Sequence, residues 1–219
     1  MKKAGLVFIM MAIACGVIHA QDHELQKSWG VGAGALGYTG RYSVNADLST
    51  KVSYNVNALY QQHIINNNVW VRANGVFGQL KGDNTSFENS RAAKGSFSTN
   101  MAELSVLAGL DIFDLSKKRF TPYVAAGVGA YSLLGYKASN GATKPNKDKT
   151  AFVVPVLGGV AFKATNKIAV FAEGNVRLLN KNLDNVYGTG VSNPNRYYSI
   201  NIGARYSLNA SDIVNKPIW

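Results

Sequence analysis

The feature that most constrains this chain is a two-residue alternation of apolar and polar side chains that recurs along its length. In the segment 101–112 every even position is apolar, whereas the odd positions include Glu103 and Asp111. The segments 52–60 and 197–208 alternate in the same way. Successive side chains of a β-strand point to opposite faces, and helical spacing fits none of these segments. The chain is therefore predicted to be all-β.

The pattern predicts eight strands, each near or above the roughly 9–11 residues that a tilted strand needs to cross a bilayer. Their expected ranges are 28–38, 50–61, 69–80, 99–112, 120–136, 150–163, 168–180 and 196–208. Long polar connections alternate with short ones; the long ones are 39–49, 81–98, 137–149 and 181–195, and the short ones are 62–68, 113–119 and 164–167. This arrangement is typical of an eight-stranded antiparallel up-and-down transmembrane β-barrel with both termini in the periplasm.

The N-terminus reads as an export signal. Lys2 and Lys3 precede an apolar core at 6–17, and Ala20 offers a cleavage site. We therefore expect a signal peptide at 1–20, a barrel at 21–208 and a short periplasmic tail at 209–219. The one cysteine, Cys15, lies inside the signal, so the exported chain has none for a disulfide or a zinc site. The longest apolar run beyond the signal, 151–162, is too short for a membrane helix and contains Pro155.

Alternation alone does not say which face of the barrel is outside. A soluble lipocalin-like carrier keeps its apolar face inside, whereas a membrane barrel turns that face to lipid. The glycines and charges of the other face, such as Gly32, Gly34 and Arg72, favour the membrane barrel. Aromatic residues near strand ends, where interfacial girdles lie, favour it as well: Trp29, Tyr38, Tyr60, Trp70, Phe120, Phe162 and Tyr206.

Three segments carry a family resemblance. Asn201, Gly203, Tyr206 and Leu208 are spaced as in the signal that directs outer-membrane barrels to their assembly machinery. The segments 120–132 and 159–173 resemble strands of the small OmpA-like, OmpX-like and opacity-type surface barrels. The resemblance covers most of 26–208 and implies location in the outer membrane of a Gram-negative bacterium, with the barrel assembly machinery as a partner.

No set of residues predicts catalysis. Small outer-membrane enzymes use a histidine near the outer mouth, but the three histidines of this chain are His19 in the signal, His23 at the exported N-terminus and His63 at the first short connection. The last two are expected on the periplasmic side. Cysteine is missing from the exported chain and the carboxylates are scattered, so no metal site and no cofactor are expected.

The inward charges predict a closed lumen. The expected register points six charged residues into the barrel: Arg72, Glu103, Asp111, Glu173, Arg177 and Arg205. Buried charges require partners. Glu173 and Arg177 share a face of one strand, and Arg205 is on the next, so we expect these three to form a set. A narrow barrel filled by such pairs is a plug.

The net charge of +11 is compatible with nucleic-acid binding, but export argues against that partner. Outer-membrane lipid and lipopolysaccharide are the expected anionic surroundings, with Lys137, Lys144, Lys147 and Lys149 of the third long connection as candidate phosphate contacts. The favoured hypothesis is a monomeric, non-enzymatic surface barrel whose four long loops meet an unknown extracellular ligand. A narrow pore for small solutes and a soluble lipocalin-like carrier are the alternatives.

Overall fold

The computed structural model describes residues 26–39, 52–65, 68–83, 96–115, 117–139, 150–179 and 196–208. These residues form eight strands: β1 (Lys27–Thr39), β2 (Ser53–Ile65), β3 (Val69–Asp83), β4 (Ser96–Asp111), β5 (Phe120–Ser139), β6 (Thr150–Lys163), β7 (Ile168–Leu179) and β8 (Arg196–Ser207). All eight predicted strands are present. The predicted signal peptide, His23 and the tail at 209–219 lie outside the described residues.

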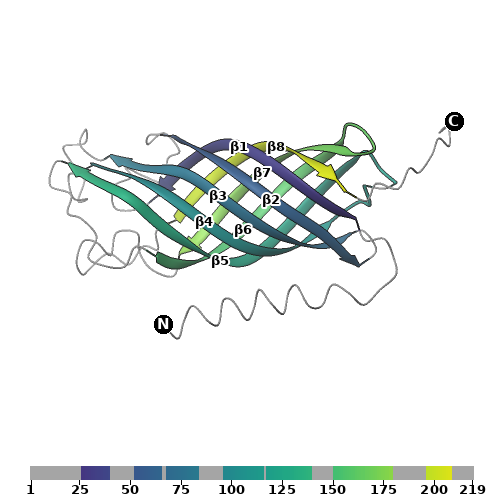
Figure 1. The fold of residues 1–219 in the computed structure, drawn as a ribbon, viewed down its shortest axis with the longest axis horizontal. Helices are drawn as coiled ribbons and strands as arrows, with labels where there is room; N and C mark the ends of the chain where they lie inside the picture. Colours follow the sequence, from purple (N-terminus) through teal and green to yellow (C-terminus); the bar gives the residue numbers. More distant parts are fainter. Residues whose placement is uncertain are drawn as a thin grey trace.

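Each strand pairs antiparallel with the next, and β8 pairs with β1, so the sheet closes on itself. Figure 1 shows the strands crossing the long axis of the barrel at a slant. The predicted eight-stranded antiparallel up-and-down barrel is thereby confirmed. Among the described residues, no helix is long and apolar enough to cross a membrane.

The two ends of the barrel differ in their connections. The start of β1, the end of β8 and the strand ends where β2 leads to β3, β4 to β5 and β6 to β7 lie together at one end, which we name the short-turn end. The links 40–52, 84–95, 140–149 and 180–195 join strands at the opposite, long-connection end. This alternation of short and long links is the one that the sequence predicted.

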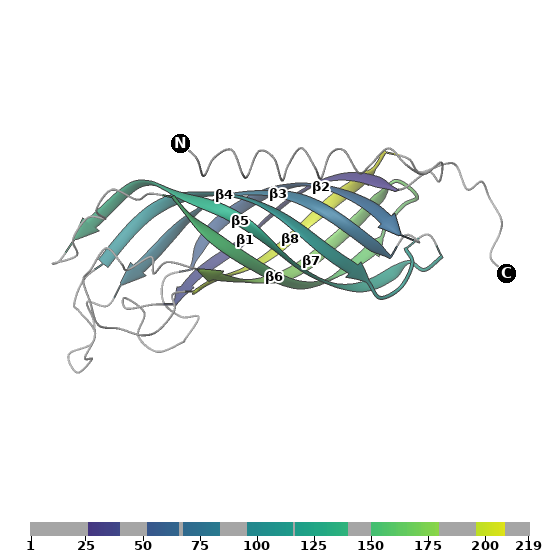
Figure 2. The same cartoon turned by 90° about the horizontal axis from the view of Figure 1, so that it is seen from below.

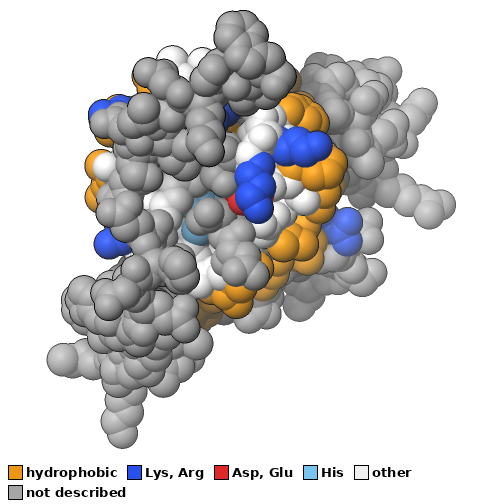
Figure 3. Space-filling model, turned by 90° about the vertical axis from the view of Figure 1, so that its right-hand side faces the viewer, with side chains coloured by type: hydrophobic (Ala, Val, Ile, Leu, Met, Phe, Trp, Pro, Cys, Tyr) orange, Lys and Arg blue, Asp and Glu red, His pale blue; other side chains and the backbone are white. Residues whose placement is uncertain are grey.

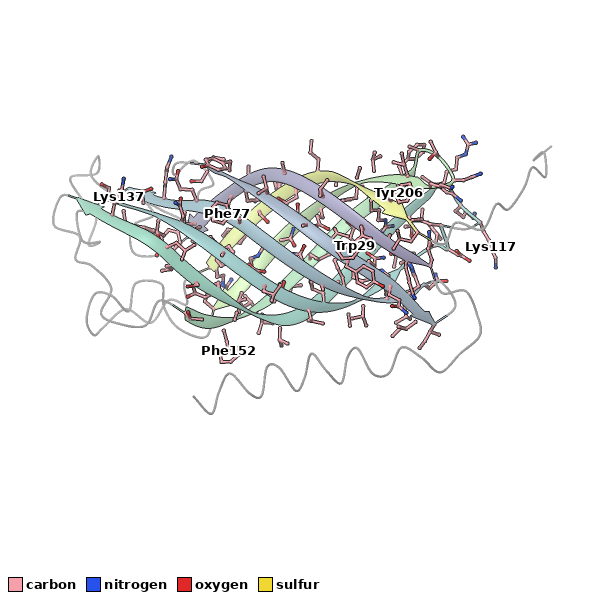
Figure 4. All side chains as sticks on the ribbon, viewed as in Figure 1. Trp29, Phe77, Lys117, Lys137, Phe152 and Tyr206 are labelled. Carbon is pink, nitrogen blue, oxygen red and sulfur yellow. The ribbon has the colours of Figure 1, made fainter. Side chains whose placement is uncertain are left out.

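The alternation of the sequence becomes an alternation of exposure. On β8, Ile200 and Ile202 are 63% and 68% exposed, whereas Asn201 between them is 1% exposed. Figure 4 shows Trp29, Phe77, Phe152 and Tyr206 projecting from the outer surface. A large apolar surface of this kind is stable only when something apolar covers it. A lipocalin-like carrier, which needs the opposite arrangement, is therefore excluded.

Two of the predicted girdle aromatics face the other way. Tyr38 and Trp70 are 3% and 0% exposed and lie inside the barrel. They share the parity of the inward residues Leu36 and Arg72, and a residue's parity along a strand fixes its face wherever it lies along the strand. The prediction was wrong for these two because it relied on their position near strand ends.

Three strands extend beyond the others at the long-connection end. β5 has 20 residues and β4 has 16, whereas β7 and β8 have 12 each. The pairing of β5 with β6 begins at Ser132, but its pairing with β4 continues to Ser139. Figures 1 and 2 both show β3, β4 and β5 reaching past the rest of the barrel on this side.

Candidate functional site

The lumen is the part of the barrel where the predicted charged residues meet. Arg72, Glu103, Asp111, Glu173, Arg177 and Arg205 all point inward, and each is between 1% and 4% exposed. They come from β3, β4, β7 and β8. Because each strand delivers its charges from a different side, their partners lie across the barrel and are separated by long stretches of sequence.

The first ion pair lies toward the long-connection end. Arg177 Nε on β7 donates to Glu103 Oε2 on β4 at 2.9 Å, and Arg177 Nη1 donates to Ser199 Oγ at 2.6 Å. The hydroxyl of Tyr197 donates to the same carboxylate, and Ser105 Oγ donates to Glu103 Oε1 at 3.2 Å. The carboxylate and the guanidinium are therefore both paired and hydrogen-bonded, as burial of charge requires.

The second ion pair lies nearer the short-turn end. Arg72 Nη1 on β3 donates to Glu173 Oε2 on β7 at 2.9 Å, and the Tyr123 hydroxyl donates to the same oxygen at 2.9 Å. Arg72 also donates through Nε and Nη2 to Gln61 Oε1, and its guanidinium carbon lies 4.6 Å from the centre of the Trp70 ring. These contacts cross the lumen at a second level.

The expected partnership of Glu173 with Arg177 is wrong. Arg177 pairs with Glu103, and Glu173 pairs with Arg72. Glu173 and Arg177 do share a face of β7, as predicted, but two residues of one strand that are four positions apart lie at different heights in the barrel. At each height, the nearest opposite charge comes from another strand.

A third polar cluster lies at the short-turn end. Trp70 Nε1 donates to Asp111 Oδ1 at 2.8 Å, and His63 Nε2 lies 3.3 Å from Asp111 Oδ2. The other ring nitrogen of His63 lies 3.3 Å from the backbone oxygen of Gln26. The sequence placed His63 in a short connection, but β2 continues through it. Its odd position, in step with the inward residues Asn55 and Asn57, was the signal that would have found it.

A glycine makes this cluster possible. A Cβ on Gly109 would lie 2.2 Å from Cζ2 of the Trp70 ring, much closer than two such atoms can approach. The indole therefore lies flat over the bare backbone of β4, with its N–H directed at Asp111 two residues further along the same strand. The missing side chain of Gly109 therefore leaves the space that the Trp70 ring occupies.

Apolar side chains fill the lumen around these polar layers. One cluster, at the long-connection end, consists of Leu36, Tyr38, Leu80, Phe97, Met101, Tyr131, Leu133, Val153, Leu179 and Tyr197. A second, nearer the short turns, consists of Leu59, Trp70, Leu107, Leu115, Tyr123, Ala125, Leu157, Ala161 and Phe171. Sequence reasoning missed this apolar filling because it expected an inner face of glycines and charges.

Between the two ion pairs the lumen wall is rich in asparagine. Asn55, Asn57, Asn74, Asn175 and Asn201 are each 5% exposed or less. Each has at least one side-chain polar atom that forms no hydrogen bond with any described residue. Buried polar atoms of this kind are usually satisfied by ordered water. The middle of the lumen is thus polar without being charged.

The remaining predicted residues lie elsewhere. On β8, Asn201 and Gly203 face the lumen and Tyr206 faces outward with 47% of its surface exposed, as does Leu208 directly after the strand with 51%. Lys137 is exposed and belongs to β5, not to a loop; Figure 4 places it at the long-connection end. Lys144, Lys147 and Lys149 lie outside the described residues. Among the described residues, no three metal-binding side chains form a group.

Comparison with known proteins gives a family and a fold. A family model described as "Domain of unknown function (DUF6089)" matches residues 3–213. No curated protein matches the chain. Among solved structures, Ail of Yersinia pestis, in complex with the heparin analogue sucrose octasulfate, is similar at a TM-score of 0.52 and 14% identity, covering 85% of this chain and 100% of Ail.

Two further barrels are similar to the same degree. The Neisserial surface protein A has a TM-score of 0.51 at 13% identity, covering 82% of this chain and 96% of its own. The outer membrane protein OprG of Pseudomonas aeruginosa has a TM-score of 0.51 at 10% identity, covering 85% and 97%. At such low identity the likeness shows a shared fold, that of small eight-stranded barrels.

Proposed function

The chain belongs to the family described as a domain of unknown function (DUF6089), and we propose that it is a non-enzymatic, monomeric barrel of a bacterial outer membrane that serves envelope structure or surface contact. The observation that carries the proposal is the filling of the lumen by ion pairs and apolar side chains. Two ion pairs, Arg177 with Glu103 and Arg72 with Glu173, cross the lumen at different heights inside an apolar outer surface. Lipid would cover that surface, and closure of the sheet leaves no edge unpaired in the membrane.

The orientation follows from the two ends. The short-turn end, with the first and last strand ends, would face the periplasm, and the extended β3, β4 and β5 would reach outward. Ail, a barrel of this fold, was solved in complex with the heparin analogue sucrose octasulfate, and we propose a polyanion as a surface partner here as well. The exposed Lys137 is the described residue that we propose for contact with lipopolysaccharide phosphates.

His63 supports a role without catalysis. A histidine that activates a serine needs one ring nitrogen on the acid and the other on the nucleophile. Here the second nitrogen lies against the backbone oxygen of Gln26. The His63–Asp111 contact therefore fits a structural role at the short-turn end. Separately, the assembly signal on β8 fits delivery of the chain by the barrel assembly machinery.

The experiment that tests the closed lumen is planar-bilayer conductance of the purified protein. We expect no stable open steps from the wild type, because both ion pairs and the apolar layers block the path. A variant that carries Arg72→Ala together with Arg177→Ala is the matched comparison, and it should conduct more often. Heat-dependent migration on a denaturing gel shows that each sample is a folded barrel.

Reproducible open steps from the wild type would favour the second candidate, a narrow pore for small solutes. The asparagine-rich middle of the lumen is the observation in its favour, because its unpartnered polar atoms suit a short column of water. Purification of the protein from a soluble fraction without detergent would contradict both membrane proposals.

A further inference from the structure

Arg205 differs from the other lumen arginines. It is 4% exposed, and its only hydrogen bond to a described side chain runs from Nη1 to Gln61 Oε1 at 3.0 Å. Its Nη2 has no hydrogen-bond partner among the described residues. Arg72 and Arg177 each have a carboxylate, but no described carboxylate forms an ion pair with Arg205. A buried guanidinium without an anion is unfavourable, so a partner from outside the barrel would stabilise it.

Arg205 lines a small cavity at the short-turn end. The cavity has a volume of about 10 Å³, which is room for roughly one water molecule. Its other polar lining residues include Ser28 of β1, His63 of β2, Ser207 of β8, Lys163 at the end of β6 and Lys167 in the link between β6 and β7. Arg205 therefore lines the cavity and also carries the unpartnered nitrogen, and these are two separate observations.

The chemistry of the wall selects for an anion. Guanidinium and ammonium groups only donate hydrogen bonds, and serine hydroxyls are able to donate as well. No acidic residue is among the described residues that line the cavity. The nearest lumen carboxylate on this side, Asp111, is engaged by Trp70 and His63. A cation would therefore meet Arg205 and two lysines, with no acidic side chain among the described residues of the wall.

The surroundings of the cavity are basic as well. Lys117, Lys118 and Arg119 are exposed in the link between β4 and β5, at the same end of the barrel. Asp114 is the acidic residue of that link, and Lys117 lies 4.0 Å from it. Figure 3 looks onto this end and shows Lys and Arg side chains spaced around it, beside the hydrophobic outer surface. A positive surface of this kind raises the local concentration of anions.

We propose that this cavity binds a phosphate-class oxyanion. One oxygen would enter the cavity and accept from Arg205, and the rest of the anion would stay at the mouth beside Lys163 and Lys167. Guanidinium groups suit phosphate oxygens because their donors lie in a fixed plane. The anion comes either from free phosphate or from a phospholipid headgroup of the adjacent leaflet. The lipid source rests on the proposed membrane location, whereas the site itself does not.

The test is calorimetric titration of the folded protein with inorganic phosphate, in a neutral sugar detergent without phosphate groups. We expect saturable binding by the wild type and a loss of about tenfold or more in affinity in Arg205→Gln. Arg119→Gln removes an exposed cation at the same end, outside the cavity wall, and is the matched control. It should stay within about twofold of the wild type, since screening weakens an exposed charge.

Two further arms make the outcome decisive. A Lys163→Gln, Lys167→Gln variant leaves Arg205 in place and should also bind more weakly, so the proposal remains testable if Arg205→Gln does not fold. The same titration in phospholipid nanodiscs identifies the source: binding that persists assigns free phosphate, and binding seen only in detergent assigns the headgroup. If the wild type shows no saturable binding in detergent, the cavity holds only water and the proposal is wrong. That result would leave the conductance test of the proposed function unaffected.

Discussion

Arg177 and Arg205 lie on neighbouring strands and point into the same lumen, but their surroundings differ. Arg177 has a carboxylate at 2.9 Å, a serine hydroxyl, and the Tyr197 ring with its centre 5.2 Å from the guanidinium carbon. Arg205 has one amide oxygen and a nitrogen that forms no hydrogen bond with any described residue. Equal burial therefore does not mean an equal role. Arg177 completes a layer in which its donors are paired, whereas Arg205 keeps a donor that is free among the described residues and that a ligand could use.

The largest effect is expected from Arg177→Ala. Removal of one member of a buried ion pair leaves Glu103 uncompensated, which costs about 3–5 kcal/mol of unfolding free energy. Lys137→Ala, an exposed residue of β5, is the control and should change stability by no more than about 0.5 kcal/mol. Urea unfolding of both variants in one lipid measures the difference. Equal midpoints would mean that the lumen is wet enough to solvate Glu103, and the comparison with Arg205 would lose its basis.

A medium effect is expected from Gly109→Ala, which tests how closely Trp70 packs against β4 beside Asp111. The added methyl group would displace the Trp70 ring, and overpacking of this kind costs about 1–3 kcal/mol. Gly174→Ala on the outer face, where a Cβ meets nothing within 4 Å, is the matched control. Urea midpoints followed by tryptophan fluorescence report both changes. An unchanged midpoint in Gly109→Ala would show that the indole has room to move.

The smallest effect on stability is expected from Arg205→Gln without phosphate, about 1 kcal/mol or less. No carboxylate of the described residues loses an ion-pair partner in this variant, and Gln61 Oε1 still accepts from Arg72 Nη2 at 2.9 Å. The measurement is the urea midpoint beside that of Arg177→Ala in the same phosphate-free detergent. A loss as large as that of Arg177→Ala would place Arg205 in a closed structural layer and remove the contrast between the two residues.

The sequence predicted all eight strands and the face of each charged lumen residue, although it placed Tyr38 and Trp70 on the wrong face. The range 150–163 was predicted to the residue, and every predicted inward charge is buried. Alternation has this power because a change of one residue in register moves a side chain to the opposite face. His63 was placed in a turn only because the prediction ended β2 four residues early, although its odd position already assigned it to the lumen.

The ion-pair partners of the charged lumen residues could not be predicted from the sequence in the same way. Glu103 meets Arg177 because the heights of β4 and β7 are set by the registers of all the strands between them. The face of a residue is a local property of its strand, whereas its height is a sum over the whole sheet. The Arg205 cavity depends on the same sum, and no motif in the sequence marks it.

The pairing of β1 with β8 has a consequence for how the molecule forms. Seven of the eight strand pairs join neighbours along the chain, but Ser28 meets Ser207 near opposite ends of it. The entropic free-energy cost of joining two chain positions rises by about 0.6 kcal/mol for each doubling of the intervening length. The β1–β8 seam therefore carries the largest cost of the eight. Until β8 has been synthesised and has arrived, β1 presents an edge of unpaired amides that no hydrocarbon phase tolerates. Entry into a bilayer and formation of the last seam must therefore occur as one event, which makes the final strand the step that commits the chain to the membrane.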